Sequence, residues 1–462
     1  MRMRKIGGIA AFNRLRNKSL SFVNYTALSI TPQTFSLVSL GCPKNLVDSE
    51  QIVFALKQGG LTFRTEIDGC ETVVLNTCGF LRSARDEARD YIRALIDLKR
   101  QNRIKRISVR GCMTKHEGIE KLRSEFPDVD EWYSTANEQA DNETLNTLPQ
   151  RELLTVTHVA YLRIADGCNR RCTFCAIPNI RGNFRSVPLE PLLDEAKRLA
   201  DAGVKELVVI AQETTFWGSD IYGKPRLTEL LRKLAAADGI RWIRLMYSYP
   251  QYFDDDLIAL FAEGGKLLPY IDIPLQHCND EILQRMNRRV TKAETETLLE
   301  TLRNRIPNLV LRTSLITGFP GETDAMFSEL QQFVDRWQFE RAGVFAFSPE
   351  RGTAAAGFAG RVPPRVIERR YEALYKTCEK YSLSWARRQK GNVLDVQIDG
   401  NYIDDAGRQE PNLYVARTYA DAPDIDPVVF VTFSSPPVLP LSNLMQCEIV
   451  EAEACDLIGV CG

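Results

Sequence analysis

Three cysteines lie close together in one short segment of the chain, at Cys168, Cys172 and Cys175. Cysteine thiolates are the usual ligands of iron–sulfur clusters. A cubic cluster has one more iron than this segment has thiolates, so one iron is left open to bind another molecule. The C-x-x-x-C-x-x-C spacing therefore predicts a catalytic [4Fe–4S] cluster, with these three cysteines as its ligands.

Two other interpretations of this group are a structural zinc site and a disulfide. Structural zinc has four closed ligands, usually in two pairs. The candidate fourth ligands are distant in sequence, because His158 precedes the group by ten residues and His277 follows by more than a hundred. Disulfides belong to oxidising compartments, and the chain has no pattern of a secretory signal. Both interpretations fit less well than a cluster.

A second set of cysteines follows three strands predicted near the N-terminus. The strands are expected at 34–40, 72–76 and 106–110, and Cys42, Cys78 and Cys112 come after them in that order. Helical periodicity between the strands indicates a parallel sheet. Because parallel strands end at one edge of a sheet, the three thiols should converge and hold a second [4Fe–4S] cluster. The alternative is three buried structural cysteines.

The composition places the chain among globular proteins, with 44% hydrophobic residues, 26% charged residues and a net charge of −1. This balance gives no sign of general nucleic-acid binding or of disorder, and no apolar run is long enough to span a membrane. Twelve cysteines without an export signal indicate metal ligands or reduced thiols. We therefore expect a cytoplasmic protein. The basic stretch 1–34 is interpreted as a disordered or start-site extension, with an organellar transit peptide as the alternative.

Strand–helix alternation resumes after a polar stretch near residue 150. Six strands are expected at 159–165, 206–211, 242–247, 270–273, 310–316 and 343–347. Helices such as 189–202 and 227–237 separate them. Six βα units predict a partial TIM-like barrel, whose functional face lies at the carboxyl ends of the strands. Cys168 follows the first of these strands and is therefore expected at that face.

The last part of the chain changes character. A basic helix is expected over 361–390 as the closing helix of the barrel, and residues 391–462 contain short β segments that predict a small β-barrel. That final part has a formal charge of −10, which indicates either a solvated surface or a dock for a basic partner. The fold class is thus α/β, divided into 1–34, 35–150, 151–390 and 391–462.

Several motifs resemble those of the radical S-adenosylmethionine methylthiotransferases. The matching segments are Gly41 to Glu50, Leu75 to Phe80, Gly167 to Gly182, Pro274 to His277 and Thr313 to Glu322. The similarity runs from about residue 35 to the end and places a TRAM-like domain at 391–462. It implies two [4Fe–4S] clusters and S-adenosylmethionine as cofactors. One molecule of S-adenosylmethionine would methylate a sulfur at the Cys42/Cys78/Cys112 cluster, and a second would yield a radical at the other.

The resemblance also implies weaker site residues. Gln212, Glu213, Ser314 and Gly318 would bind S-adenosylmethionine, although a polar barrel end or a simple turn is the structural alternative. Arg170, Arg171, Arg181 and Arg185 flank the cysteine motif, where they would offset cluster charge, guide a flavodoxin-like electron donor or simply face solvent.

Within the family, three features favour the branch that methylthiolates the β-carbon of an aspartate in small-subunit ribosomal protein twelve. The first is the tripeptide Pro43-Lys44-Asn45, the second is the combination of the segments Ala211–Thr215 and Tyr247–Pro250, and the third is the acidic final domain. A basic ribosomal protein, free or in the subunit, would be the partner, with no membrane and no direct nucleic acid. The alternatives are a tRNA adenosine methylthiotransferase of the MiaB type and a non-catalytic iron–sulfur protein.

Overall fold

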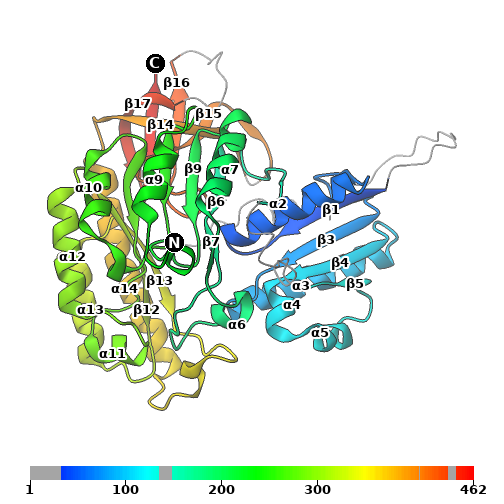
Figure 1. Cartoon of the computed structure of the whole chain (residues 1–462), viewed down its shortest axis with the longest axis horizontal. Helices are drawn as coiled ribbons and strands as arrows, with labels where there is room; N and C mark the ends of the chain where they lie inside the picture. The colour runs from blue at the N-terminus through cyan, green and yellow to red at the C-terminus, as the bar shows by residue number, and fades with distance from the viewer. Residues whose placement is uncertain (1–32, 135–147, 405, 435–443) are drawn as a thin grey trace. The chain divides into compact units, whose positions relative to one another are not determined.

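The structure is a computed structural model that describes residues 33–134, 148–404, 406–434 and 444–462. These residues fall into two compact units (Figure 1). The larger unit is formed by Thr155–Cys175 and Phe184–Gly462, and the smaller by the described residues up to Leu154 together with Ala176–Asn183. Most of the expected basic extension, 1–34, lies outside the described residues, and so does most of the polar stretch before residue 150.

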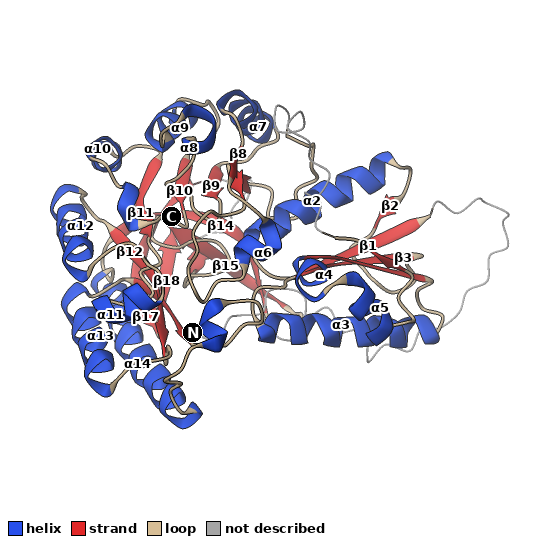
Figure 2. Cartoon of the chain, turned by 60° about the horizontal axis from the view of Figure 1, so that its bottom comes forward, coloured by secondary structure: helices blue, strands red, loops and turns tan. Residues whose placement is uncertain are grey.

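The smaller unit is built on a parallel five-stranded sheet in the order β2-β1-β3-β4-β5. Its strands are β1 (Thr34–Ser39), β2 (Thr62–Phe63), β3 (Thr72–Thr77), β4 (Arg106–Gly111) and β5 (Glu131–Trp132). Its main helices are α2 (Pro43–Gln58), α3 (Arg82–Arg100), α4 (Cys112–Glu117) and α5 (Ile119–Glu125). Helix α2 lies on one face of the sheet, and α3 and α5 lie on the other (Figure 2). The three predicted strands are confirmed, whereas the two short edge strands were not predicted.

The larger unit contains a parallel six-stranded sheet in the order β13-β12-β11-β10-β9-β6. Its strands are β6 (Val159–Arg163), β9 (Glu206–Ile210), β10 (Trp242–Leu245), β11 (Leu267–Asp272), β12 (Val310–Thr317) and β13 (Arg341–Ala346). Spatial order follows chain order, as in a barrel that stops at six strands, and helices cover its outer side (Figure 2). The predicted partial barrel is therefore confirmed.

Helices fill the connections of the barrel, as their 3.6-residue apolar spacing predicts. They are α7 (Leu189–Asp201), α8 (Ser219–Tyr222), α9 (Leu227–Ala235), α10 (Asp255–Glu263), α11 (Asp280–Arg285), α12 (Lys292–Arg305), α13 (Asp324–Trp337) and α14 (Pro364–Arg388). A separate antiparallel pair, β7 (Ala165–Asp166) with β8 (Arg185–Ser186), brackets the cysteine segment. The first barrel strand was predicted to reach Ala165, but it ends at Arg163 because Ala165 pairs with β8 instead.

The last part of the chain is a closed barrel in the order β14-β15-β16-β18-β17. Its strands are β14 (Val393–Ile403), β15 (Gln409–Thr418), β16 (Val429–Phe433), β17 (Leu444–Glu453) and β18 (Asp456–Cys461). The small β-barrel expected for residues 391–462 is therefore confirmed. Closure removes the unpaired strand edges that would otherwise invite association with other chains.

Several acidic residues of this small barrel pair with basic side chains inside the larger unit. Asp421 contacts Arg341 at 2.6 Å, and Asp426 contacts Arg312 at 3.4 Å and accepts a hydrogen bond from Tyr270 at 2.6 Å. Asp399 contacts Arg417 at 2.6 Å and His158 at 2.9 Å. The expectation of a −10 surface is therefore too simple, because part of this charge is neutralised inside the fold.

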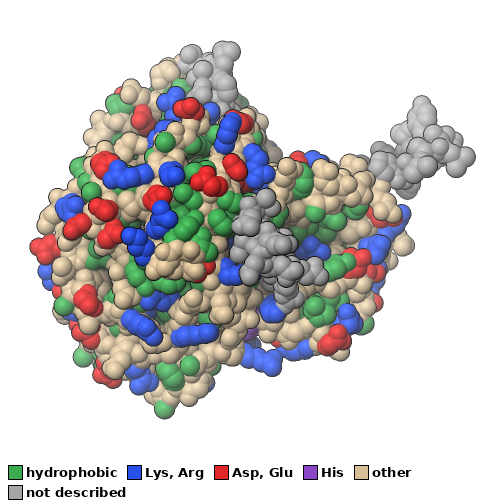
Figure 3. Space-filling model, viewed as in Figure 1, with side chains coloured by type: hydrophobic (Ala, Val, Ile, Leu, Met, Phe, Trp, Pro, Cys, Tyr) green, Lys and Arg blue, Asp and Glu red, His purple; other side chains and the backbone are tan. Residues whose placement is uncertain are grey.

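The remaining charges are mixed over the molecule. On the face drawn in Figure 3, basic and acidic side chains are interspersed, which agrees with the net charge of −1. Among the residues that the structure describes, no helix combines the length and the apolar character needed to cross a bilayer.

Candidate functional site

The first candidate site lies at the carboxyl edge of the sheet in the smaller unit. Cys42 caps the start of α2, Cys78 follows β3, and Cys112 begins α4 directly after β4. Burial, together with the charges of Cys42 and Cys112, raises the pKa of the Cys78 thiol to about 12. Burial also raises the pKa of Cys112 to about 11. The structure thus brings these three predicted thiols into one neighbourhood, in which Cys112 is buried and Cys42 and Cys78 are partly buried.

Glycines allow the three loops to approach one another. A Cβ atom on Gly41 would lie 2.7 Å from the Cβ of Cys78, and one on Gly79 would lie 2.8 Å from the backbone nitrogen of Met113. Both distances are shorter than real carbon contacts permit. The loops that carry Cys42, Cys78 and Cys112 can therefore pack together only because these positions have no side chain.

This packing predicts that Gly79→Ala will disrupt the thiol site. The new methyl group would meet backbone atoms of the Cys112 loop, which cannot rotate away, so we expect a loss of about 1–3 kcal/mol of stability from overpacking. Iron bound after anaerobic reconstitution should fall from about eight to about four per chain.

The matched control for this variant is Gly357→Ala, since a Cβ atom there meets nothing within 4 Å. Its iron content should equal that of the wild-type protein. A Gly79→Ala protein with full iron content would contradict the close-packing argument.

Arg181 also belongs to this site, although nothing in its local sequence distinguishes it from the neighbouring arginines. It ends α6 (Ile177–Arg181), within the segment that joins the smaller unit, and its side chain is 2% exposed. It pairs with Asp48 at 2.7 Å and hydrogen-bonds to Cys112, where its charge opposes the rise of the thiol pKa. The alternative of a solvated Arg181 is wrong.

The second candidate site is the segment of Cys168, Cys172 and Cys175 in the larger unit. It follows β6 and β7, at the carboxyl end of the barrel strands, as predicted. Backbone contacts anchor it, because Thr173 N donates to Met286 O at 3.1 Å and Thr173 Oγ1 donates to Arg285 O at 2.8 Å. Burial raises the pKa of Cys168 to about 11.

Two of the residues expected to bind S-adenosylmethionine contact this segment. Glu213 forms a bidentate ion pair with Arg170 at 2.8 and 2.9 Å, and Gln212 donates to Asp166 at 2.9 Å. The Oε1 atom of Gln212 is buried and has no hydrogen-bond partner among the described residues. Such an orphaned acceptor at the barrel mouth is suited to a ligand that donates a hydrogen bond.

Of the other two residues, Ser314 lies within β12 and Gly318 follows directly after it. The carbonyl of Ser314 accepts a hydrogen bond from Gln276 N at 2.8 Å. Gly318 has φ +78°, its N–H donates to Glu322, and a Cβ atom there would lie 2.6 Å from Ile367 of α14. The turn and the packing of α14 therefore account for Gly318, while its role in cofactor binding stays a prediction.

The donor sets fit iron–sulfur clusters better than single ions. Each group offers three thiols, one buried and two partly buried, and cysteine thiolates are the usual ligands of such clusters. In the described part of the chain no three Cys, His, Asp or Glu residues gather closely enough to hold one metal ion. A single zinc ion would hold each sulfur about 2.3 Å from the metal, so its sulfur ligands would lie close to one another. In a cluster each thiolate binds a different iron, so the sulfur atoms of the three cysteines lie farther apart.

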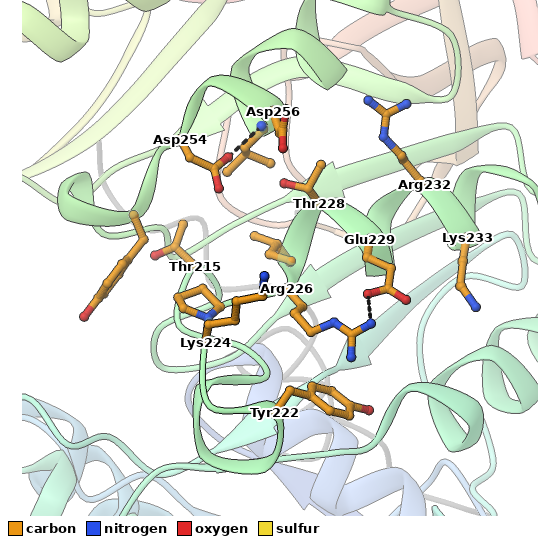
Figure 4. Close-up of a pocket in the computed structure, with 14 residues that line it drawn as sticks. Thr215, Tyr222, Lys224, Arg226, Thr228, Glu229, Arg232, Lys233, Asp254 and Asp256 are labelled. Atoms are coloured by element: carbon orange, nitrogen blue, oxygen red, sulfur yellow. Dashed lines mark hydrogen bonds and ion pairs between the residues drawn. The ribbon is translucent and has the colours of Figure 1, made fainter.

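A surface pocket of about 720 Å³ lies elsewhere in the larger unit (Figure 4). Thr215, Tyr252, α9 and the start of α10 line it, and no cysteine does. Its charged side chains are partly engaged, since Arg226 pairs with Glu229 and Asp254 caps α10. Gln212, Glu213, Ser314 and Gly318 are also absent from its lining.

Comparison with known proteins defines the class first. The radical SAM superfamily matches residues 162–334, the uncharacterized protein family UPF0004 matches 34–134, and the TRAM domain matches 391–461. This is a radical SAM protein with an added domain on each side. A solved radical SAM methyltransferase, TsrM from Kitasatospora setae, covers 68% of the chain and 72% of its own at 13% identity and a TM-score of 0.47, too distant to support an argument.

Curated relatives then define the family. The ribosomal protein uS12 methylthiotransferase RimO of Lachnoclostridium phytofermentans is 38% identical over 91% of this chain and 98% of its own length. The RimO of Bacteroides fragilis is 37% identical over 92% and 99%. The chain belongs to the RimO family of methylthiotransferases, and the resemblance inferred from the motifs is confirmed.

Proposed function

We propose that this protein attaches a methylthio group to the β-carbon of an aspartate in ribosomal protein uS12. The observation that carries the proposal is the pair of three-thiol groups, each at the carboxyl edge of a parallel sheet, in a chain of the RimO family. One group would serve sulfur attachment and the other hydrogen abstraction. The hydrogen on an aspartate β-carbon is only weakly acidic, and its replacement by a methylthio group oxidises the carbon, so acid–base groups alone could not carry out the reaction.

Six cysteines would hold the two cofactors. Cys42, Cys78 and Cys112 would ligate one [4Fe–4S] cluster, and Cys168, Cys172 and Cys175 the other. With S-adenosylmethionine, such a cluster supplies a carbon-centred radical that can break an unreactive C–H bond. Because the pKa of Cys78, Cys112 and Cys168 is raised to about 11 or 12, these thiols keep their protons at neutral pH until iron binds and displaces them.

Nearby residues would orient the ligands and exclude water. Arg181 places a buried positive charge beside Cys112, where it would favour the thiolate form and any anionic sulfur held there. Gln212 offers a buried free acceptor for the amino group of S-adenosylmethionine. Glu213 would hold the cysteine segment in place through its ion pair with Arg170.

The partners follow from charge. The exposed acids of the small barrel, among them Asp395, Glu410 and Glu448, suit a strongly basic ribosomal protein, with or without the rest of the subunit. The same surface would repel RNA, because nucleic-acid binding depends on cations that neutralise phosphates. A low-potential donor of the flavodoxin type would supply electrons.

The test is anaerobic reconstitution with iron, sulfide, S-adenosylmethionine and a reductant, followed by incubation with purified uS12. Tandem mass spectrometry should find one methylthio group in place of a hydrogen on one aspartate. A parallel reaction with bulk tRNA should give no methylthio-adenosine. Modified tRNA with unmodified uS12 would overturn the proposal in favour of the tRNA branch.

A further inference from the structure

The ring of Tyr249 contacts two guanidinium groups beside the Cys168–Cys175 segment. The ring centre lies 3.8 Å from the guanidinium carbon of Arg170 and 4.3 Å from that of Arg288. Tyr249 is buried, and its hydroxyl accepts a hydrogen bond from the backbone nitrogen of Arg289 at 3.1 Å. Cations within about 6 Å of an aromatic face are attracted to it, so Tyr249 fixes both arginines.

Each arginine also touches a cysteine of the candidate cluster site. The backbone N–H of Arg170 donates to the sulfur of Cys168 at 3.4 Å, and Nη1 of Arg288 donates to the sulfur of Cys172 at 3.9 Å. A second nitrogen of Arg288, Nη2, donates to Pro274 O at 2.6 Å and so fixes the direction of the guanidinium. Arg170 therefore reaches sulfur with a neutral backbone N–H, whereas Arg288 reaches it with its charged guanidinium.

The two arginines differ in charge compensation. Glu213 neutralises Arg170 through its bidentate ion pair. Arg288 forms no ion pair with any residue that the structure describes, and its Nε is buried without a hydrogen-bond partner there. Of the two arginines that contact Tyr249, Arg288 is therefore the one whose positive charge is uncompensated.

We propose that Arg288 is a positioning residue that holds the Cys172 sulfur and makes the cluster easier to reduce. The inference rests on the proposed function, since it requires a cluster at Cys168, Cys172 and Cys175. Reduction adds one negative charge to a cluster, and a nearby cation or an N–H donated to a ligand sulfur stabilises the reduced form more than the oxidised form. Tyr249 keeps Arg288 in place in both forms.

The experiment measures the midpoint potential of this cluster alone. Cys42, Cys78 and Cys112 are replaced by alanine so that one cluster remains, and redox titration is followed by electron paramagnetic resonance of the reduced form. In this background, Arg288→Met should give a more negative potential than the parent, and Arg288→Lys should lie between them. Arg285→Met is the matched control, because Arg285 contacts Pro320 O and Ala359 O rather than sulfur, and it should leave the potential unchanged.

The outcomes separate this inference from the proposed function. Equal potentials in the parent and in Arg288→Met, or an equal shift in Arg285→Met, would overturn the role of Arg288 while leaving the cluster in place. If Arg288→Met binds no iron, the Arg288→Lys protein decides, and an unchanged potential there with wild-type iron content overturns the inference. A parent protein that binds no iron at all would instead refute the cluster assignment itself.

Discussion

Replacing Cys172 with alanine is expected to abolish both the release of 5′-deoxyadenosine and the methylthiolation of uS12. Replacing Cys78 with alanine is expected to abolish methylthiolation alone. The two cysteines lie in different units of the structure, so the loss of one cluster should leave the other intact. Because the C–H bond is unreactive without a radical, the loss of methylthiolation should exceed about 1000-fold, or about 4 kcal/mol of activation free energy.

Three measurements on each variant check this expectation. Iron analysis should give about four irons per chain in either variant, against about eight in the wild-type protein. Chromatography then quantifies 5′-deoxyadenosine, and mass spectrometry quantifies modified uS12. Cys455→Ala is the control, since Cys455 lies in the small barrel. If the Cys78→Ala protein methylthiolates uS12 at the wild-type rate, the division of labour between the two sites is wrong.

The placement of the six cysteines could be predicted from sequence because strands and helices alternate regularly along the chain. Cys42, Cys78 and Cys112 each come after a β-strand, and the alternation of strands and helices requires those strands to be parallel. Strand ends then converge regardless of the distance in sequence. The same rule places Cys168 at the mouth of the six-stranded barrel, so local periodicity was enough to group these thiols.

The charged contacts around the sites could not be predicted in this way. Arg181 differs in no local pattern from Arg185, yet it is buried against Asp48 because its short helix packs with the smaller unit. Likewise, the sequence suggests that Asp421 and Asp426 are charged surface residues. In the structure they pair with Arg341 and Tyr270, which precede them by about 80 and 156 residues. Such pairs depend on tertiary packing and leave no periodic signal.

Glu206→Gln is expected to cost about 3–5 kcal/mol of stability, because it leaves buried cations without their anion. Glu206 begins β9, is fully buried, and contacts Arg244 at 2.8 Å and Arg417 of β15 at 2.7 Å. Arg417 retains Asp399, but Arg244 keeps no anion, only the carbonyls of Tyr419 and Thr418 and the ring of Tyr270. The free energy of unfolding in urea measures the effect. Lys390→Met is the control, since its pair with Glu451 is exposed and should contribute less than about 1 kcal/mol.

The same carboxylate makes the stability depend on pH. Burial alone would raise the pKa of Glu206, but Arg417 and Arg244 outweigh burial and lower it below its usual 4.5. Because the folded pKa is lowered, this stabilisation is complete above pH 4.5 and is lost as the pH falls through the folded value. The wild-type protein should therefore lose stability on acidification below about pH 4.5, and Glu206→Gln should lose less over the same range. Parallel acid profiles for the two proteins would show that the charge of Glu206 does not hold the small barrel against the larger one.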